Sequence, residues 1–221
     1  GYGAFNKWHG FRHLPAGRYD RVLGLGSAFG AEFLPVLGRL GSLTVLEPAA
    51  SLRSADLQGV PIQYVDPQPS GLMPFDTASF DLVTSFGTLH HIPNVSTVVA
   101  EMARVTRPGG WLLIREPVIS MGDWRAPRGR GVTVRERGIP VGLFPAMFER
   151  AGLRVARGAL CMFPTTRRLG AYHLGFDSRA GVILDAVLSR LTARTLHYHA
   201  QTRWQKVRPT AVFYVLEKVG T

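Results

Sequence analysis

Residues 20–48, DRVLGLGSAFGAEFLPVLGRLGSLTVLEP, decide the fold of this chain. The stretch begins with an apolar run at residues 21–25, which predicts a buried parallel strand. A turn containing Gly26 and Gly30 follows the strand. Glycines at this place let the backbone approach a ligand closely, and the start of the next helix offers free N–H groups.

The second half of the stretch completes a strand–turn–helix–strand unit. Apolar residues at helical spacing span residues 33–40, and an apolar strand at residues 43–46 ends on the acid Glu47. A carboxylate about 20 residues after the glycine turn can hold both ribose hydroxyls of a nucleoside. This unit therefore suits a nucleoside-bearing cofactor.

Two classes of cofactor fit this layout. The dinucleotide fingerprint G-x-G-x-x-G fits poorly, because counting from Gly24 places the third glycine one residue late. Counting from Gly26 gives G-x-x-x-G, which resembles the first motif of class I S-adenosylmethionine (SAM) methyltransferases. In that family an acid usually stands where this chain has Gly24, and a glycine where it has Ala28. A tight turn without a ligand is the structural alternative.

Composition indicates one α/β domain. The chain has 221 residues, of which 46% are hydrophobic, and this is enough for a sizeable core. No apolar run reaches the roughly 18 residues of a membrane helix and no signal peptide is visible, so we expect a cytoplasmic location. The single cysteine, Cys161, excludes an internal disulfide and a cysteine-cluster metal site, and we expect it in the core.

The formal net charge of +11 comes mostly from arginines, many of them within residues 103–168. Such a surface suggests an anionic partner, which could be a phosphate, a nucleic acid or a membrane face. A solvated basic face is the plain alternative. Nucleic acid is the least favoured of these partners, because no recognition-helix motif and no interleaving of aromatics with arginines is present.

Strands and helices alternate further along the chain. Apolar strands are predicted at residues 60–65, 80–85 and 111–114, and a helix is predicted at residues 95–105. The alternation predicts a doubly wound parallel sheet, in which ligands bind beyond the carboxyl ends of the strands. Polar residues gather at those ends, as the architecture requires of a site.

Residues 74–94, PFDTASFDLVTSFGTLHHIPN, and residues 104–117, RVTRPGGWLLIREP, closely resemble class I SAM-dependent methyltransferases of the LPF-x-x-x-SFD type. The tail, with LFPAMFERAGLRV and PTAVFYVLEK, fits the last two strands of that family. The resemblance implies a Rossmann-like, doubly wound seven-stranded sheet with a helical insert before the last strand. We expect one domain made of an N-terminal flap (1–19), a core (20–163), a helical insert (164–208) and a final strand (209–221).

The resemblance also implies which residues hold SAM. Gly26, Ser27 and Gly30 would approach the methionine part, Glu47 the ribose, and Asp66 the adenine amino group. The complete predicted set is Gly24, Gly26, Ser27, Gly30, Glu47, Pro48, Asp66, Leu72, Met73, Ser85 and Phe86. Gly24 lacks the carboxylate that commonly helps to fix the amino end of the cofactor, so either another group does this or SAM binds more weakly.

Methyl transfer from SAM is an in-line displacement, in which much of the catalysis is alignment. A hydroxyl acceptor also benefits from a base, and histidine suits that role. His90 and His91 follow the fourth predicted strand, at the methyl end of the cofactor in this fold, and the sequence does not distinguish them. Glu116 is a second candidate base or a substrate anchor. A structural role in the loop is the alternative for the histidines.

Residues 118–140 form an arginine-rich loop in the usual place for substrate recognition in this family. Trp124 could stack on a sugar or base, and Arg125 and Arg137 could bind phosphates. A mobile solvated loop is the alternative. His173 belongs to an aromatic, histidine-rich insert that could be a substrate lid, a packing element or a dimer interface.

Within that insert, the apolar stripe Val182, Ile183, Ala186, Val187 and Leu191 is expected to pack against the domain. His197 and His199 are two residues apart and do not share a helix face, so no metal site is predicted.

The sequence therefore predicts a SAM-dependent methyltransferase that produces S-adenosylhomocysteine and methylates the oxygen of a glycosyl or other small acceptor. The segments REPVISMGDWR and ERGIP resemble methyltransferases associated with surface-polysaccharide synthesis. A natural-product methyltransferase, a SAM-binding partner domain without catalysis and, less favoured, a nucleic-acid methyltransferase are the alternatives. A homodimer is one option for assembly.

Overall fold

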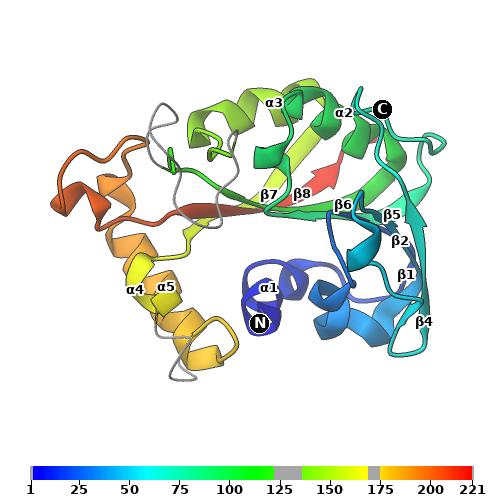
Figure 1. Cartoon of the computed structure of the whole chain (residues 1–221), viewed down its shortest axis with the longest axis horizontal. Coiled ribbons are helices and arrows are strands. Elements are labelled where there is room, and N and C mark those ends of the chain that lie inside the picture. The colour runs from blue at the N-terminus through cyan, green and yellow to red at the C-terminus, as the bar shows by residue number, and fades with distance from the viewer. Residues whose placement is uncertain (1, 122–135, 169–174, 221) are drawn as a thin grey trace.

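The computed structural model describes residues 2–121, 136–168 and 175–220, and its centre is an eight-stranded mixed sheet (Figure 1). The order of the strands is β3-β4-β2-β1-β5-β6-β8-β7. The strands are β1 (Tyr19–Leu25), β2 (Leu40–Leu46), β3 (Asp56–Leu57), β4 (Val60–Val65), β5 (Phe80–Phe86), β6 (Thr106–Pro117), β7 (Leu153–Cys161) and β8 (Ala211–Lys218).

Parallel pairing joins the five central strands from β4 to β6, and β8 pairs antiparallel with both β6 and β7. The predicted doubly wound α/β fold is confirmed. The sheet has eight strands rather than the seven predicted, because the two-residue strand β3 adds an antiparallel edge to β4. Between β2 and β3 the chain forms only a short 3-10 turn at Ala50–Leu52.

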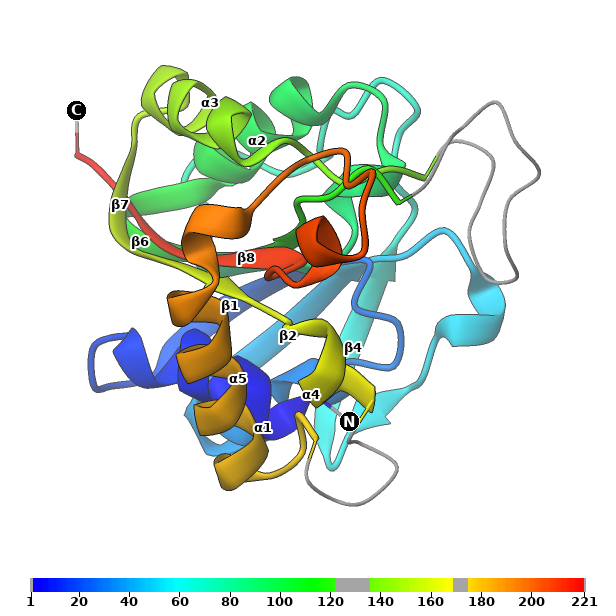
Figure 2. The ribbon, with the colours of Figure 1, turned by 90° about the vertical axis from the view of Figure 1, so that its left-hand side faces the viewer.

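Helices cover both faces of the sheet (Figures 1 and 2). Helices α2 and α3 lie on one face, and α1, η2 and α5 lie on the other. The helices are α1 (Gly3–His9), α2 (Val95–Val105), α3 (Phe144–Arg150), α4 (Pro164–Arg168) and α5 (Arg179–Leu191), and the 3-10 segments are η1 (Phe11–His13), η2 (Ala31–Arg39), η3 (Ala50–Leu52), η4 (Leu89–His91), η5 (Val141–Leu143), η7 (Ala193–Thr195) and η8 (Trp204–Lys206).

Each face of the sheet has its own apolar core. Leu23, Val83 and Leu112 point to the side of α2 and α3, whereas Val22 and Leu82 point to the side of α1. Neighbouring residues of a strand face opposite sides, so the continuous apolar runs of the central strands fill both cores.

The segment after the glycine turn is the 3-10 helix η2, not the α-helix that the spacing predicts. Pro35 lies inside it and has no N–H to donate to an α-helical hydrogen bond. Phe33 and Val36 are buried, whereas Leu34 is exposed. The turn itself needs glycine, because Gly30 has a φ of +74° and packs against Leu43 and Ile62.

The N-terminal segment is docked onto the sheet. Phe5 and Phe11 are fully buried, and the backbone N–H of Phe5 donates to the carbonyl of Phe176 at 3.1 Å. Helix α1 packs against both η2 and α5. Residues 2–14 therefore belong to the core on this face.

Helix α5 is held by a buried carboxylate rather than by its apolar stripe. Asp185 accepts hydrogen bonds from the backbone N–H groups of Met162 (3.0 Å) and Phe163 (2.7 Å), and from Thr166 Oγ1 (2.6 Å). Burial raises the pKa of Asp185, and these hydrogen bonds oppose the rise.

The expected packing of the α5 stripe is wrong. Of its residues only Val182 is fully buried, whereas Ile183, Val187 and Leu191 are exposed. The inward face of α5 includes Val182, Asp185 and Ser189, so the apolar stripe is turned largely to the outside. Among the described residues no helix has the length and apolar character needed to cross a membrane.

Candidate functional site

A pocket of about 570 Å³ opens where β1, β2, β4 and β5 end. Gly26 follows β1, Glu47 and Pro48 follow β2, and Gly87 to His91 follow β5. The loop after β4 supplies Leu72 and Met73. These strand ends meet at one edge of the sheet, which is the position predicted for the cofactor.

The glycine turn fits closely against the loop after β5. Gly26 has a φ of +62°, and a side chain there would overlap Thr88 Oγ1, which donates to the carbonyl of Leu25 at 3.0 Å. Position 26 therefore requires glycine for conformation and for space. This contact fixes the floor of the pocket.

Glu47 is buried at the end of β2, and its Oε1 accepts a hydrogen bond from the Ala49 N–H at 3.0 Å. In the described part of the chain that bond is the one contact of its carboxylate. A carboxylate fixed in this way at the pocket wall can accept hydrogen bonds from ligand hydroxyls. The geometry suits the ribose role predicted for it.

Helix α2 holds the loop that carries Leu72 and Met73. Glu101 Oε2 accepts from the Met73 N–H at 2.8 Å, and Arg104 donates to Glu101 and to the Met73 carbonyl. Met73 is buried and Leu72 is half exposed, so both offer apolar surface to the pocket. Asp66 is exposed, pairs with Arg53 and lies outside the pocket lining.

Five further residues predicted for the cofactor also lie outside this lining. Ser85 and Phe86 are buried in β5, and Phe86 packs against Phe11 and Phe213 on the other face. The remaining three are Gly24, which lies in β1, and Ser27 and Gly30, which lie in the turn after it.

Ser27 belongs to a buried polar cluster that the sequence analysis missed. Glu32 Oε1 accepts hydrogen bonds from Ser27 Oγ (2.7 Å) and Thr84 Oγ1 (3.2 Å). Burial raises the pKa of Glu32 to about 7, although Ser27 and the charge of Arg115 oppose the rise. A side chain at Gly24 would overlap Ser27, so the cluster fills the space beside that glycine.

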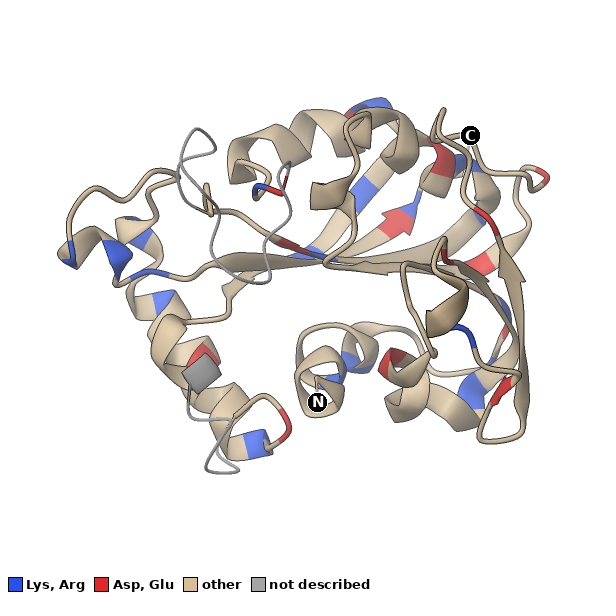
Figure 3. Ribbon diagram, in the orientation of Figure 1, with Lys and Arg blue, Asp and Glu red and all other residues tan. Residues whose placement is uncertain are grey.

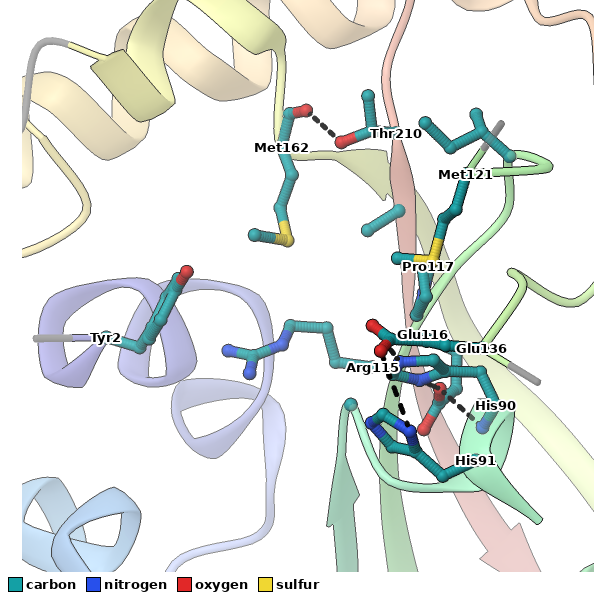
Figure 4. A pocket seen from close by; sticks show the side chains of 13 residues that line it. Tyr2, His90, His91, Arg115, Glu116, Pro117, Met121, Glu136, Met162 and Thr210 are labelled. Carbon is teal, nitrogen blue, oxygen red and sulfur yellow. Dashed lines mark hydrogen bonds and ion pairs between the residues drawn. The ribbon is translucent and has the colours of Figure 1, made fainter. Parts of the chain in front are cut away.

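A second pocket, of about 310 Å³, adjoins the first (Figure 4). Gly87 and His91 line both pockets. The second pocket also contains His90 and Glu116, together with Glu136 from the far end of the arginine-rich loop. The two histidines and Glu116 are therefore brought together, as predicted, at the carboxyl end of the sheet.

Glu116 is a fully buried acceptor that orients His90. Its Oε1 accepts the N–H groups of Thr88 (3.0 Å) and Leu89 (2.9 Å), and its Oε2 accepts the N–H of His90 (3.2 Å). His90 Nδ1 lies 2.8 Å from the same Oε2. With Nδ1 donating to this carboxylate, the free lone pair of a neutral His90 is on Nε2.

The two histidines have opposite electrostatic surroundings. Burial lowers the pKa of His90, but the hydrogen bond and charge of Glu116, together with Glu136, outweigh it, so its pKa lies above the ordinary value. Burial and the neighbouring charge of His90 lower the pKa of His91, whose ring centroid lies 4.0 Å from that of His90. His90 is therefore the better proton acceptor of the two.

Glu136 faces both histidines. Its Oε1 lies 3.4 Å from His90 Nε2 and its Oε2 lies 4.0 Å from His91 Nδ1. The donor atoms of these three residues lie within 4.8 Å of one another, close enough to reach one cation. The same geometry places a negative charge where an imidazolium would form.

Arg115 forms the opposite wall together with Tyr2 (Figure 4). Its guanidinium lies 4.6 Å from the centre of the Tyr2 ring, donates to Asn6 Oδ1 at 2.8 Å and contacts Phe86. Burial lowers the pKa of Arg115. Tyr2, the residue just before helix α1, thus contributes to this pocket.

Of the residues predicted for the substrate, Trp124, Arg125 and His173 lie outside the described residues. Arg137 is exposed and does not line either pocket. Tyr2 and Glu136 were missed because each reaches the smaller pocket from a distant part of the chain. Glu32 was missed because its contacts with Ser27 and Thr84 depend on how η2 folds against β5. Only the acidic character of Glu136 in an arginine-rich loop could have singled it out.

Comparison with known proteins relates part of this chain to a known family. Residues 22–114 match the model of a methyltransferase domain. A ubiquinone biosynthesis O-methyltransferase of Paracidovorax citrulli is 36% identical over 99 residues, which are 42% of this chain and 41% of that protein. The chain thus matches about two fifths of the length of this curated relative.

Solved structures are similar over almost the whole chain. A methyltransferase structure from Bacillus halodurans, described as putative, has a TM-score of 0.64 at 16% identity and covers 99% of this chain and 100% of its own. A SAM-dependent methyltransferase from Mesorhizobium loti has a TM-score of 0.62 at 18% identity and covers 94% of each chain. The fold is that of class I SAM-dependent methyltransferases.

Proposed function

We propose that this SAM-dependent methyltransferase methylates a hydroxyl group of a small molecule, with His90 as the base. The observation that carries the proposal is the junction of the two pockets at Gly87 and His91. A cofactor in the larger pocket and an acceptor in the smaller one would meet there, beside His90. Such alignment is the main requirement of methyl transfer.

The residues of the larger pocket fit SAM. Glu47 would accept the ribose hydroxyls, and Leu72 and Met73 would flank the adenine. Asp66 was expected at the adenine amino group, but its pairing with Arg53 supports a role in fixing the loop instead. When bound, SAM would supply an activated methyl group on a sulfonium.

His90 would take the proton of the acceptor hydroxyl on Nε2. Glu116 holds the ring through Nδ1 and stabilises the imidazolium that forms. Glu136, at 3.4 Å from Nε2, adds a second negative charge. Glu116 itself accepts three backbone N–H groups, so it is a positioning residue and not the base. His91 would shape the junction of the pockets.

The smaller pocket favours a compact acceptor. Its volume of about 310 Å³ is near the lower end for ligand sites. The guanidinium of Arg115 and the ring of Tyr2 would suit an aromatic or anionic acceptor. The Paracidovorax citrulli relative is named as an O-methyltransferase of ubiquinone biosynthesis, and this name also favours methyl transfer to an oxygen. The sequence analysis also predicts a glycosyl acceptor and a link to polysaccharide synthesis. Both rest on the segments REPVISMGDWR and ERGIP.

Calorimetric titration with SAM and S-adenosylhomocysteine tests the first half of the proposal, and micromolar binding of both is expected. Labelled SAM would then be supplied with a panel of phenols and a panel of sugar nucleotides. Methyl transfer to a phenol and loss of that transfer in His90→Ala, with SAM binding retained, would support the complete assignment. Tight SAM binding without turnover on any acceptor would favour a non-catalytic partner domain.

A further inference from the structure

We propose that a basic and apolar face at the end of α5 docks onto an anionic lipid bilayer. The face consists of Val187, Arg190 and Leu191 of α5, Arg194 of η7, and Trp204 and Lys206 of η8. All six residues are exposed, and the inference is independent of the proposed function.

The apolar members of this face are unusually open to solvent. Val187 is 50% exposed, Leu191 75% and Trp204 84%. The structure explains why they are not drawn inward, because α5 is fixed to the end of β7 through Asp185 and buries Val182 and Ser189. Removing such side chains from water is favourable, and a bilayer interface offers them a place.

The charge of this region is complementary to an anionic surface. Residues 178–216 contain six Lys and Arg residues and one acid, Asp185, which is fully buried. Figure 3 shows basic segments gathered at the end of the molecule formed by η7 and η8. Each Lys or Arg near an anionic leaflet strengthens binding, and apolar side chains beside them strengthen it further by inserting into the bilayer interface.

A groove of about 560 Å³ between α5 and β7 continues the face. Its floor is apolar, with Ile183 and Ala186 from α5, and its rim carries Arg12, Arg157 and Arg190. An apolar floor with guanidinium groups at its edge suits an amphiphile with an anionic head. β7 is the outermost strand of the sheet, so the groove lies at the surface of the domain.

The alternatives fit these features less well. In a symmetric dimer built on this face, each copy would present the same basic face to the other, and like charges would repel. A nucleic acid would satisfy the arginines through its phosphates, but it would give no comparable place to Leu191 and Val187. An anionic bilayer accommodates both kinds of side chain.

The chain segments on either side of η8 reach the region of the smaller pocket. Tyr198, between η7 and η8, donates through its hydroxyl to the Gly138 carbonyl at 2.7 Å, and its backbone carbonyl accepts from the Ser120 N–H at 3.0 Å. Thr210, just beyond η8, lines that pocket. A chain docked through this face would therefore hold its smaller pocket close to the membrane surface, where apolar acceptors concentrate.

Co-sedimentation with vesicles of phosphatidylcholine, alone or with about one third phosphatidylglycerol, tests the proposal. Wild type should bind the mixed vesicles and lose binding in high salt, because exposed charges are screened. The variant Arg190→Gln/Arg194→Gln should bind roughly 25-fold more weakly, at about fivefold for each charge. Trp204→Ser should weaken binding and remove a blue shift of the tryptophan fluorescence. SAM affinity serves as the control for folding of every variant.

The matched control is Arg18→Gln/Leu34→Ser, which changes an exposed arginine and an exposed leucine outside this face and should bind vesicles like wild type. The proposal is overturned if the mixed vesicles are not bound, or if both double variants bind equally. Tighter binding of RNA or DNA than of vesicles would show a nucleic-acid surface. Dimerisation that Leu191→Ser abolishes would show an interface between copies. Each of these results is separable from a failure to bind SAM.

Discussion

Replacing Glu116 by Gln tests how His90 is positioned, because it removes a charge with little change of shape. Glu116 accepts three backbone N–H groups and contacts His90 Nδ1. A glutamine amide has one oxygen acceptor and one NH2 donor, so its NH2 group faces at least one of these N–H groups and leaves it without an acceptor. A buried donor without an acceptor costs about 1–3 kcal/mol. We therefore expect a lower melting temperature and near-normal SAM affinity, since Glu116 does not line the larger pocket.

The loss should be clearest in the acid–base properties of His90. Glu116 raises the pKa of His90, so Glu116→Gln should lower that pKa, which NMR titration of the histidine ring can follow without an acceptor. With an acceptor, activity of wild type should rise with pH as His90 loses its proton. In the variant the rise should occur at lower pH, and kcat should be about 100-fold lower.

Glu217→Gln is the matched control for this experiment. It removes a carboxylate paired with Arg154 at the other end of β8 and should change stability by less than about 1 kcal/mol. The reasoning is refuted if Glu116→Gln leaves the pKa of His90 and kcat unchanged. A drop in SAM affinity equal to the drop in kcat would instead indicate a general structural defect.

Three further changes probe the remaining roles. Glu47→Ala should weaken SAM binding about 10- to 100-fold in calorimetry, because charge-assisted hydrogen bonds to the ribose are lost, and unchanged affinity would overturn the ribose assignment. Glu32 has a pKa raised from 4.5 to about 7, so the folded chain holds this proton more tightly and stability should fall as pH rises between these values. Thermal melts of Glu32→Gln should lack that fall, which corresponds to about 3 kcal/mol; an identical fall in the variant would contradict the assignment. EDTA should leave turnover intact if His90, His91 and Glu136 transfer a proton, whereas a loss that Zn²⁺ or Mn²⁺ restores would indicate a metal site.

Much of the fold follows from local sequence. β4 (Val60–Val65) and α2 (Val95–Val105) begin and end where the sequence predicts, because each has a clear apolar period and is bounded by residues that stop it. The helix type of η2 was missed, because a 3.6-residue spacing over so short a segment does not exclude a 3-10 helix when Pro35 removes a donor. The orientation of α5 was missed because a buried Asp185, and not the apolar stripe, fixes it.

The site was predictable only as far as strand order allows. Once the sheet is known, residues at strand ends must converge, and His90, His91 and Glu116 do so. The role of each residue depends on partners that are distant in sequence. For example, Glu116 contacts the loop after β5. The sequence pattern does not reveal that backbone N–H groups occupy the carboxylate of Glu116, or that Glu136 lies beside His90.

The structure also shows what surrounds Gly24 in the altered first motif. Gly24 stands where the resembling family has an acid, and the space beside it is filled by Ser27, whose hydroxyl donates to Glu32 at 2.7 Å. Thr84 of β5 donates to the same carboxylate, so Glu32 ties the glycine turn to the neighbouring strand. The chain therefore has a partly buried carboxylate at this corner, which comes from η2 instead of β1. This carboxylate weakens the argument for a non-catalytic domain that rests on the missing acid at position 24. Glu32 does not line the larger pocket, so Glu32→Gln should change SAM affinity only through the glycine turn that it holds, and a change in stability alone would confine Glu32 to a structural role.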